Sequence, residues 1–165
     1  QQRHLVFLLV LREFVIEGVK TKALATHCDD RGYFREIVRD DDNMLARLGQ
    51  MSASRTYPGV IKAFHWHRKQ EDLWYVGSGN VRVVLHDLRE GSPTRSETQV
   101  LYAGDDNPLA ILIPPGVAHG YQVLGNTPAL LVYATSEPYD PSDPDEERLA
   151  FDDPAIGFDW SVRNR

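Results

Sequence analysis

The sequence has 165 residues, of which 42% are hydrophobic and 25% charged, a composition that is typical of a folded globular protein and excludes a disordered chain. Its 18 lysines and arginines face 24 aspartates and glutamates, and the net charge of −6 disfavours a nucleic-acid-binding protein or one that binds an anionic membrane surface. The length suits one domain over 1–165, with an N-terminal strand or arm over 1–20 and a C-terminal extension over 138–165.

The segment from Leu5 to Leu11 is the first apolar run of the chain. It has the length of a β-strand and is far shorter than the ~20 residues that span a membrane, so we expect a buried strand and no transmembrane segment. An apolar strand at the edge of a sheet needs to be covered, which predicts a homodimer. The single cysteine, Cys28, excludes an internal disulfide and agrees with a reducing compartment, so the predicted location is the cytoplasm.

Most of the remaining chain is expected to form short strands. Glycine and proline recur at short intervals, and between them lie apolar runs of strand length at Val81 to Leu85, Ala110 to Ile113 and Ala129 to Ala134. This spacing favours an all-β sandwich or barrel. One short helix is expected from Asp42 to Gly49, because Asp and Asn favour a helix start and Gly a helix end. The acidic, proline-rich segment from Pro138 to Glu147 is expected to be a solvated connector.

Two segments carry histidines at spacings that favour metal binding. His65 and His67 are two residues apart, so on a strand both side chains project from one face, and Glu71 can return to that face from the next strand. His119 follows a Pro-x-Gly turn that redirects the chain into another strand. Three imidazoles and a carboxylate that leave open positions suit a divalent Fe, Ni, Mn, Co or Zn ion.

Simpler interpretations of these residues stay open. His65 and His119 would also be compatible with two buried histidines that bond to their neighbours. His67 and Glu71 would be compatible with a surface pair at the mouth of a barrel.

The same residues resemble the two sequence motifs of the cupin superfamily. One motif contains a glycine, two histidines and a glutamate, and the other a proline, a glycine and a histidine: Gly59, His65, His67 and Glu71, then Pro114, Gly116 and His119. The resemblance implies a double-stranded β-helix, the cupin or jelly-roll barrel, with one or two short helices. Fold alone does not imply a function.

A more specific resemblance covers most of the chain. Five segments are similar, in order, to the dTDP-4-dehydrorhamnose 3,5-epimerase family: 29–34, 59–65, 87–94, 113–120 and 152–160. The resemblance implies an isomerase that inverts carbons 3 and 5 of a 4-keto-6-deoxyhexose on a nucleoside diphosphate, without a metal or an organic cofactor. It also implies a role in dTDP-rhamnose and polysaccharide biosynthesis and a homodimer that exchanges edge strands.

The resemblance assigns the chemistry to two residues. His65 aligns with the general base, and an imidazole with a pKa near neutrality suits removal of a proton next to a ketone. The family's acid tyrosine falls on Val132 when counted from His119, with Tyr133 one residue further. We take Tyr133 as the candidate acid, although one step along a strand would turn it to the opposite face.

Four further residues are candidates for substrate binding. Arg31 aligns with a ligand of the diphosphate, for which a guanidinium fork is suited. Gln50 falls at a polar position that faces substrate, and Lys62 replaces an arginine usually found three residues before the base. His119 is the fourth candidate.

Departures from the family pattern leave other functions open. Asp72 stands near a position where the family has a lysine, and the family commonly lacks His67 and Glu71. A metal at His65, His67, Glu71 and His119 would favour a metal-assisted isomerase, with the metal polarising the ketone, or an oxygenase. A noncatalytic protein that binds sugar nucleotides is the third possibility.

Overall fold

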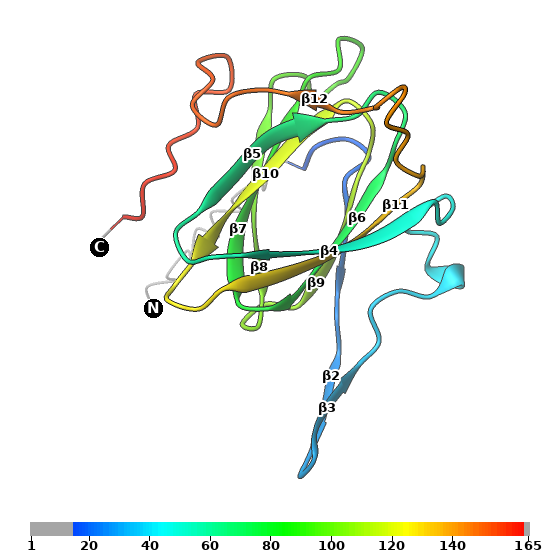
Figure 1. Ribbon diagram of the computed structural model, residues 1–165, viewed down its shortest axis with the longest axis vertical. Helices are drawn as coiled ribbons and strands as arrows, with labels where there is room; N and C mark the ends of the chain where they lie inside the picture. The colour runs from blue at the N-terminus through cyan, green and yellow to red at the C-terminus, as the bar shows by residue number, and fades with distance from the viewer. Residues whose placement is uncertain (1–14, 164–165) are drawn as a thin grey trace, which may run out of the picture.

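The computed structural model of the protein describes residues 15–163, and its strands form two five-stranded sheets that face each other, with a separate two-stranded hairpin projecting from them (Figure 1). This is the all-β, jelly-roll class that the sequence predicts. The predicted strand from Leu5 to Leu11 lies outside the described residues. Within 15–163, no helix is long and apolar enough to cross a membrane.

Every pair of neighbouring strands is antiparallel. In spatial order, the first sheet contains β1 (Lys20–Ala23), β9 (Leu109–Ile113), β6 (Asp72–Ser78), β11 (Ala129–Thr135) and β4 (Gln50–Thr56). The second contains β12 (Glu147–Arg148), β5 (Ile61–Trp66), β10 (Val117–Leu124), β7 (Asn80–Asp87) and β8 (Thr98–Gly104). The hairpin consists of β2 (Thr26–Asp29) and β3 (Gly32–Arg35).

The core lies between the two sheets, and its residues alternate along each strand. In β7, Val81, Val83 and Leu85 point into this core, whereas Val84 points to the outer face, where Trp160 of the C-terminal extension covers it. A strand that is covered on both faces has a nearly continuous apolar sequence. This explains why the three apolar runs predicted as strands are found in β7, β9 and β11.

The predicted helix from Asp42 to Gly49 is wrong. The structure has a short 3₁₀ helix at Asp40–Asp42, and Asn43 ends it in the left-handed conformation with φ of 51°. Backbone donors further along bind distant residues, because the N–H of Ala46 donates to the carboxylate of Glu71, just before β6, and that of Gly49 to the carbonyl of Thr135 in β11. These long-range hydrogen bonds have therefore replaced the bonds that would form a helix.

Candidate functional site

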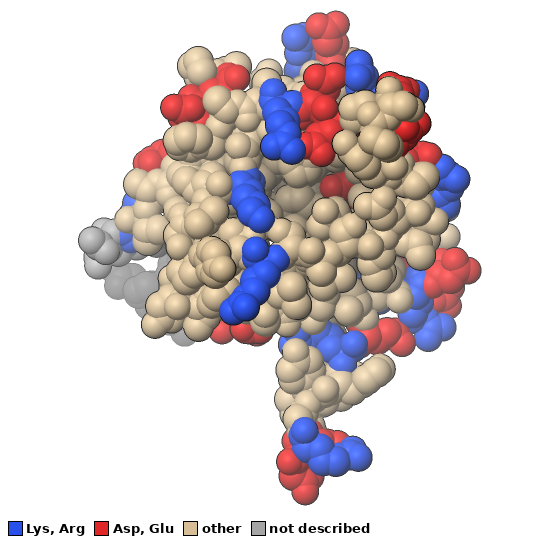
Figure 2. Space-filling model, in the orientation of Figure 1, with Lys and Arg blue, Asp and Glu red and all other residues tan. Residues whose placement is uncertain are grey.

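A cavity of about 1030 Å³ lies between the sheets and opens to the surface. Figure 2 shows the molecule hollowed on this face, with Lys and Arg side chains along one side of the hollow and Asp and Glu side chains gathered near it. Lys62 and Arg148 line the cavity from β5 and β12, and Asp140, Asp143 and Glu146 line it from the connector. The connector is therefore part of the cavity wall in addition to being a link between strands.

His65 and His119 meet inside this cavity because their strands pair. β5 and β10 place His65 opposite His119, and the close approach depends on Gly120, where an added Cβ would lie 2.3 Å from the Cβ of Ala63. The Nε2 atoms of the two histidines are 2.9 Å apart, and His119 is buried. The structure thus brings these two predicted site residues into one hollow.

The hydrogen bonds of this pair define which ring nitrogens carry protons. Nδ1 of His119 donates to the carbonyl of Val117 at 2.8 Å, so Nε2 of the neutral ring is an acceptor. The 2.9 Å contact then requires that Nε2–H of His65 donate to His119. Nδ1 of His65 makes no hydrogen bond within residues 15–163, and its lone pair is free.

His65 is neutral in this environment. The pKa of His65 is lowered to about 2, mainly by burial and further by the neighbouring His119 and His67, while the negative charge of Asp72 opposes the shift. An imidazole is a proton acceptor only in its neutral form. The ring is therefore in its proton-accepting form throughout the physiological pH range, and its pKa lies below the near-neutral value expected from the sequence.

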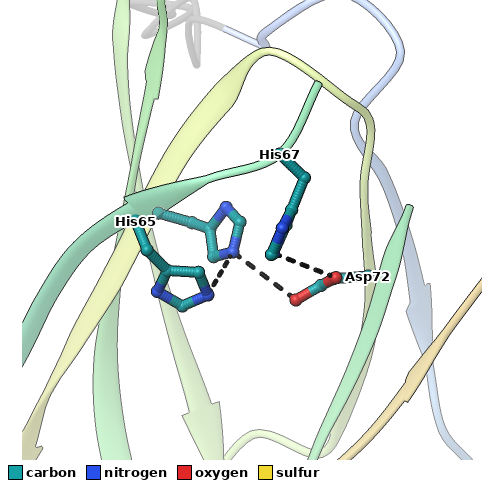
Figure 3. A group of neighbouring side chains, drawn as sticks. His65, His67 and Asp72 are labelled. Carbon is teal, nitrogen blue, oxygen red and sulfur yellow. Dashed lines mark hydrogen bonds and ion pairs between the residues drawn. The ribbon is translucent and has the colours of Figure 1, made fainter. Parts of the chain in front are cut away.

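His67 and Asp72 complete a buried polar cluster with this pair (Figure 3). The two oxygens of Asp72 lie 3.5 Å from Nε2 of His67 and 3.5 Å from Nε2 of His119. Burial alone raises the pKa of Asp72, but the contacts with His119 and His67 outweigh it and hold the pKa well below its usual range. Burial lowers the pKa of His67, and the contacts with Asp72 reverse this into a net rise.

Two donors stabilise the Asp72 carboxylate. The amide of Gln70 donates to Oδ1 at 2.7 Å and also lies 3.3 Å from Nε2 of His67. Nε1–H of Trp74 donates to Oδ2 at 3.2 Å. His67 is fixed from its other side, because its Nδ1 donates to the carbonyl of Asp145.

The predicted role of Glu71 as a metal ligand is wrong. Its carboxylate accepts the N–H of Ala46 at 3.0 Å and does not line the cavity. Asp72 begins β6 and shares the inner face with Trp74, whereas the intervening Leu73 packs on the outer face. Because successive side chains alternate between faces, one residue decides which carboxylate reaches the histidines.

The expectation that Tyr133 faces away from the histidines is also wrong. Tyr133 lines the cavity together with Leu131 and Thr135, its i−2 and i+2 neighbours on β11, whereas Val132 does not. Counting residues from His119 places the family's acid tyrosine at Val132, but the residue that faces the cavity is Tyr133. The count is therefore one residue off across the turn between β10 and β11.

The candidate substrate-binding residues divide into two groups. Gln50 and Lys62 line the cavity, and Nζ of Lys62 donates to the hydroxyl of Ser54 at 3.0 Å. Arg31 lies in the turn of the β2–β3 hairpin, where it is exposed and paired with Asp29. The structure of one chain does not bring Arg31 to the cavity.

Several residues of the site have no recognisable signal in the sequence. Asp145 accepts the N–H groups of Arg68, Lys69 and Gln70 at 2.7 to 3.0 Å and so fixes the turn after His67. The two segments are more than 70 residues apart in sequence. Tyr121 also lines the cavity, with its hydroxyl 2.8 Å from that of Thr56.

The chain is similar to named proteins over nearly its whole length. The family model described as dTDP-4-dehydrorhamnose 3,5-epimerase matches residues 13–165. The spore coat polysaccharide biosynthesis protein SpsL of Bacillus subtilis is 56% identical over 151 residues, which are 92% of this chain and 100% of that protein.

Solved structures agree with this similarity. The dTDP sugar isomerase of Desulfovibrio desulfuricans superposes with a TM-score of 0.83 at 31% identity, covering 90% of this chain and 94% of that one. The dTDP-6-deoxy-D-glucose-3,5-epimerase of Legionella pneumophila, solved in complex with dTDP-4-keto-L-rhamnose, gives a TM-score of 0.78 at 28% identity, with coverages of 89% and 80%.

Proposed function

We propose that this chain, which belongs to the dTDP-4-dehydrorhamnose 3,5-epimerase family, inverts carbon centres beside the C4 ketone of a 4-keto-6-deoxyhexose carried on a nucleoside diphosphate. The observation that carries the proposal is the placement of a neutral imidazole and a phenol in one cavity, on opposite sheets. His65 lies on β5 of the second sheet, and Tyr133 on β11 of the first. Inversion requires that a proton leave one face of the sugar and return to the other.

His65 is the proposed general base. A hydrogen next to a ketone is acidic enough for removal by an imidazole that is held within hydrogen-bonding reach. Nδ1 of His65 has the free lone pair, and Nε2–H is held by His119. The negative charge of Asp72 favours the imidazolium that forms when His65 takes the proton. This step needs no organic cofactor, because only a proton moves.

Tyr133 is the proposed acid. Its position on the sheet opposite His65 suits delivery of a proton to the other face of the enolate. A phenol is a suitable donor for this step and recovers its proton from solvent or product.

The mouth of the cavity is proposed to hold the nucleoside diphosphate. Lys62 and Arg148 supply positive charge there, and Gln50 supplies a polar contact. The β2–β3 hairpin projects from the sheets and exposes Tyr33 and Phe34 (Figure 1). We propose a homodimer in which this hairpin contacts the partner subunit, so that Arg31 binds the diphosphate in the partner's cavity.

Solvent deuterium tests the proposed reaction. The protein is incubated in D₂O with dTDP-4-keto-6-deoxyglucose, and label at C3 and C5 is followed by NMR. We expect label at one or both carbons, and a loss of about 10²- to 10⁴-fold in rate for His65→Asn, the range that a general base contributes. Glu71→Gln, outside the cavity, should keep the wild-type rate. Absence of label with the wild-type protein would contradict the proposal.

Two other proposals concern a metal ion in the cavity and the location of the protein in the cell. The cavity also offers ligands for a divalent metal, for which the positions of His67, His119 and Asp72 are the favouring observation. The proposed location is the cytoplasm, supported by the lone, exposed Cys28.

A further inference from the structure

Tyr121 and Thr56 form a buried pair of hydroxyl groups that joins the two sheets beside the cavity. Tyr121 is on β10 of the second sheet, Thr56 ends β4 of the first, and their hydroxyl oxygens are 2.8 Å apart. The exposed fractions of the two residues are only 5% and 3%. Neither hydroxyl makes another hydrogen bond within residues 15–163.

The pair contains one proton more than it uses. Each hydroxyl has one proton, and the bond between the two oxygens uses only one of them. The second proton is a buried donor for which the described part of the chain supplies no acceptor. Because an unpaired buried donor is unfavourable, this proton calls for an acceptor from outside the chain.

The cavity determines where such an acceptor can bind. Tyr121 lines the cavity, whereas Thr56 does not. If Tyr121 donated to Thr56, the remaining proton would be on Thr56, out of reach of a molecule in the cavity. If Thr56 donates instead, the phenolic O–H of Tyr121 is free to donate into the cavity. Only this second arrangement lets a bound molecule satisfy the remaining proton.

The phenol lies on the same wall as the proposed base. Tyr121 is two residues after His119 on β10, so both side chains project from the inner face, about 6.8 Å apart along the strand. His119 is in turn paired with His65. The ring of Trp74 packs edge-on against both His119 and Tyr121, with ring centroids 5.2 Å and 5.7 Å apart. This packing fixes the ring of Tyr121, and Thr56 fixes its hydroxyl.

We propose that the hydroxyl of Tyr121 is a catalytic hydrogen-bond donor to the C4 oxygen of the substrate, and that Thr56 is the residue that positions it. The inference rests on the proposed function, because the 4-keto sugar supplies the acceptor. When His65 removes a proton from the carbon beside the ketone, the electrons of that C–H bond form a C=C bond with C4. The electron pair of the carbonyl double bond then moves onto the C4 oxygen.

A donor that is fixed in advance stabilises the negative charge that develops on this oxygen. The hydrogen bond to the neutral ketone strengthens as the charge forms, so its effect is larger on the rate of proton removal than on substrate binding. Tyr121 keeps its own proton throughout this step. The proton that leaves the sugar is bound by His65.

The two tyrosines of the cavity that lie on strands differ in a way that suits two roles. The hydroxyl of Tyr133, on the sheet opposite His65, makes no hydrogen bond within the described residues, so it is free to deliver its proton to carbon. The hydroxyl of Tyr121 is held by Thr56 and suits a lasting hydrogen bond to oxygen. Tyr133 is therefore needed for inversion only, whereas Tyr121 supports the enolate that precedes both deuterium uptake and inversion.

Tyr121→Phe tests the donor because it removes the hydroxyl and keeps the ring that packs on Trp74. With dTDP-4-keto-6-deoxyglucose in D₂O, we expect kcat for uptake and for inversion to fall alike, by about 10²- to 10³-fold, with KM within about 3-fold of wild type. Tyr102→Phe, which removes an exposed hydroxyl on β8, should keep the wild-type rates. An unchanged kcat in Tyr121→Phe, or a loss confined to inversion, would overturn the proposal.

Thr56→Val tests the positioning role. The valine removes the partner hydroxyl, so the phenol is no longer held, and we expect kcat to fall about 10-fold with KM nearly unchanged. In the Tyr121→Phe background the same substitution should cause no further loss, because both residues act through one hydrogen bond. Losses that add in the double variant would overturn the positioning role of Thr56.

A spectroscopic measurement reports the hydrogen bond without turnover. His65→Asn should bind the substrate without removing its proton, and ¹³C at C4 identifies the carbonyl stretch in the infrared spectrum. We expect the stretch at a lower frequency in His65→Asn than when Tyr121→Phe is added to it, because the donor polarises the carbonyl. Adding Thr56→Val should raise the frequency as well, which covers the case in which the tyrosine variant does not fold. Equal frequencies in all these proteins would overturn the proposal.

The combined results separate this inference from the proposed function. Uptake by the wild-type protein that Tyr121→Phe leaves unchanged would refute the role of Tyr121 and leave the epimerase proposal intact. A carbonyl frequency that depends on Tyr121, without uptake by the wild-type protein, would do the reverse. The absence of both uptake and a frequency difference would refute both.

Discussion

Two buried aspartates, Asp72 and Asp87, show how differently the same side chain is used in this protein. The carboxylate of Asp87 accepts five bonds at 2.5 to 3.0 Å, from the backbone and guanidinium of Arg89 and from the hydroxyls of Ser92 and Thr94. Burial alone raises the pKa of Asp87, but these bonds outweigh it and lower the pKa below its usual range.

Asp72 has fewer hydrogen-bond donors, and its two oxygens lie 3.5 Å from the Nε2 atoms of His67 and His119 in the cavity. A carboxylate whose oxygens are fully bonded to its own loop stabilises that loop and has no remaining capacity for a ligand. A carboxylate that lies beside imidazoles can stabilise a positive charge on them. The comparison therefore assigns Asp87 to structure and Asp72 to function.

The largest expected effect on stability is at Asp87. Asp87→Ala leaves the Arg89 guanidinium and two hydroxyls without their acceptor, so we expect a loss of about 3–5 kcal/mol in the free energy of unfolding. Urea denaturation of the wild-type protein and the variant measures this loss. Asp72→Ala lacks a comparable set of dedicated donors and should lose less. Equal losses in both variants would remove the distinction between the two aspartates.

Asp72→Asn should affect activity much more than stability. The amide keeps the shape of the carboxylate and removes the charge that favours protonated His65, so we expect deuterium uptake to fall about 10- to 100-fold. The melting temperature should change by only a few degrees. Asp87→Asn should show the opposite pattern, with a large loss of stability and nearly normal uptake in the folded fraction.

The pH dependence of stability follows from the low pKa of His65. In the unfolded chain this histidine binds a proton below a pH of about 6.5, whereas in the folded protein it stays neutral down to a pH of about 2. The unfolded state therefore gains protons as pH falls, and stability drops by up to about 1.4 kcal/mol per pH unit below 6.5. Above 6.5 this contribution is fully present.

Urea denaturation at pH 7.5, 6.5 and 5.5 measures the predicted loss of stability below pH 6.5. His65→Asn should flatten the drop between pH 6.5 and 5.5, and His27→Gln, which changes an exposed histidine on β2, should leave it unaltered. His67 acts in the opposite direction, because its raised pKa means that the folded state binds this proton more tightly than the unfolded state; its contribution is nearly constant once pH is well below 6.5 and both states are protonated. A stability curve that is the same with and without His65 would contradict the burial of a neutral ring.

The smallest effect is expected at the mouth of the cavity. Lys62 is a single charge at the proposed diphosphate subsite, so Lys62→Ala should raise KM about 5- to 10-fold with little change in kcat. Arg95→Ala, in the loop that also contains Ser92 and Thr94, provides a matched loss of charge away from the cavity. Equal effects of the two variants would indicate a general effect of net charge.

Much of the fold could be predicted because covered strands have recognisable sequences. The apolar runs in β7, β9 and β11 reflect strands that pack on both faces, and the resemblance of the segments around His65 and His119 to the two cupin motifs predicts that these histidines meet in one barrel. The helix expected from Asp42 to Gly49 could not be excluded from local sequence, because its backbone donors bind partners such as Thr135 that are far away in the chain.

The details of the site depend on single-residue differences in register. The sequence indicates that a carboxylate follows His67, but whether it is Glu71 or Asp72 depends on where β6 begins. The direction of Tyr133 likewise depends on the number of residues in the preceding turn. The contact of Asp145 with the turn after His67 joins segments distant in sequence and has no local pattern.

The proposal that a proton leaves one face of the sugar and returns to the other is tested most directly by measuring deuterium uptake and inversion separately. In D₂O, Tyr133→Phe should still take up deuterium beside the ketone, because His65 can return a deuteron to the face from which it took the proton, while the inverted product falls about 10²-fold or more. His65→Asn should lose both uptake and inversion. Uptake that disappears in Tyr133→Phe and persists in His65→Asn would contradict the assignment of His65 as the base.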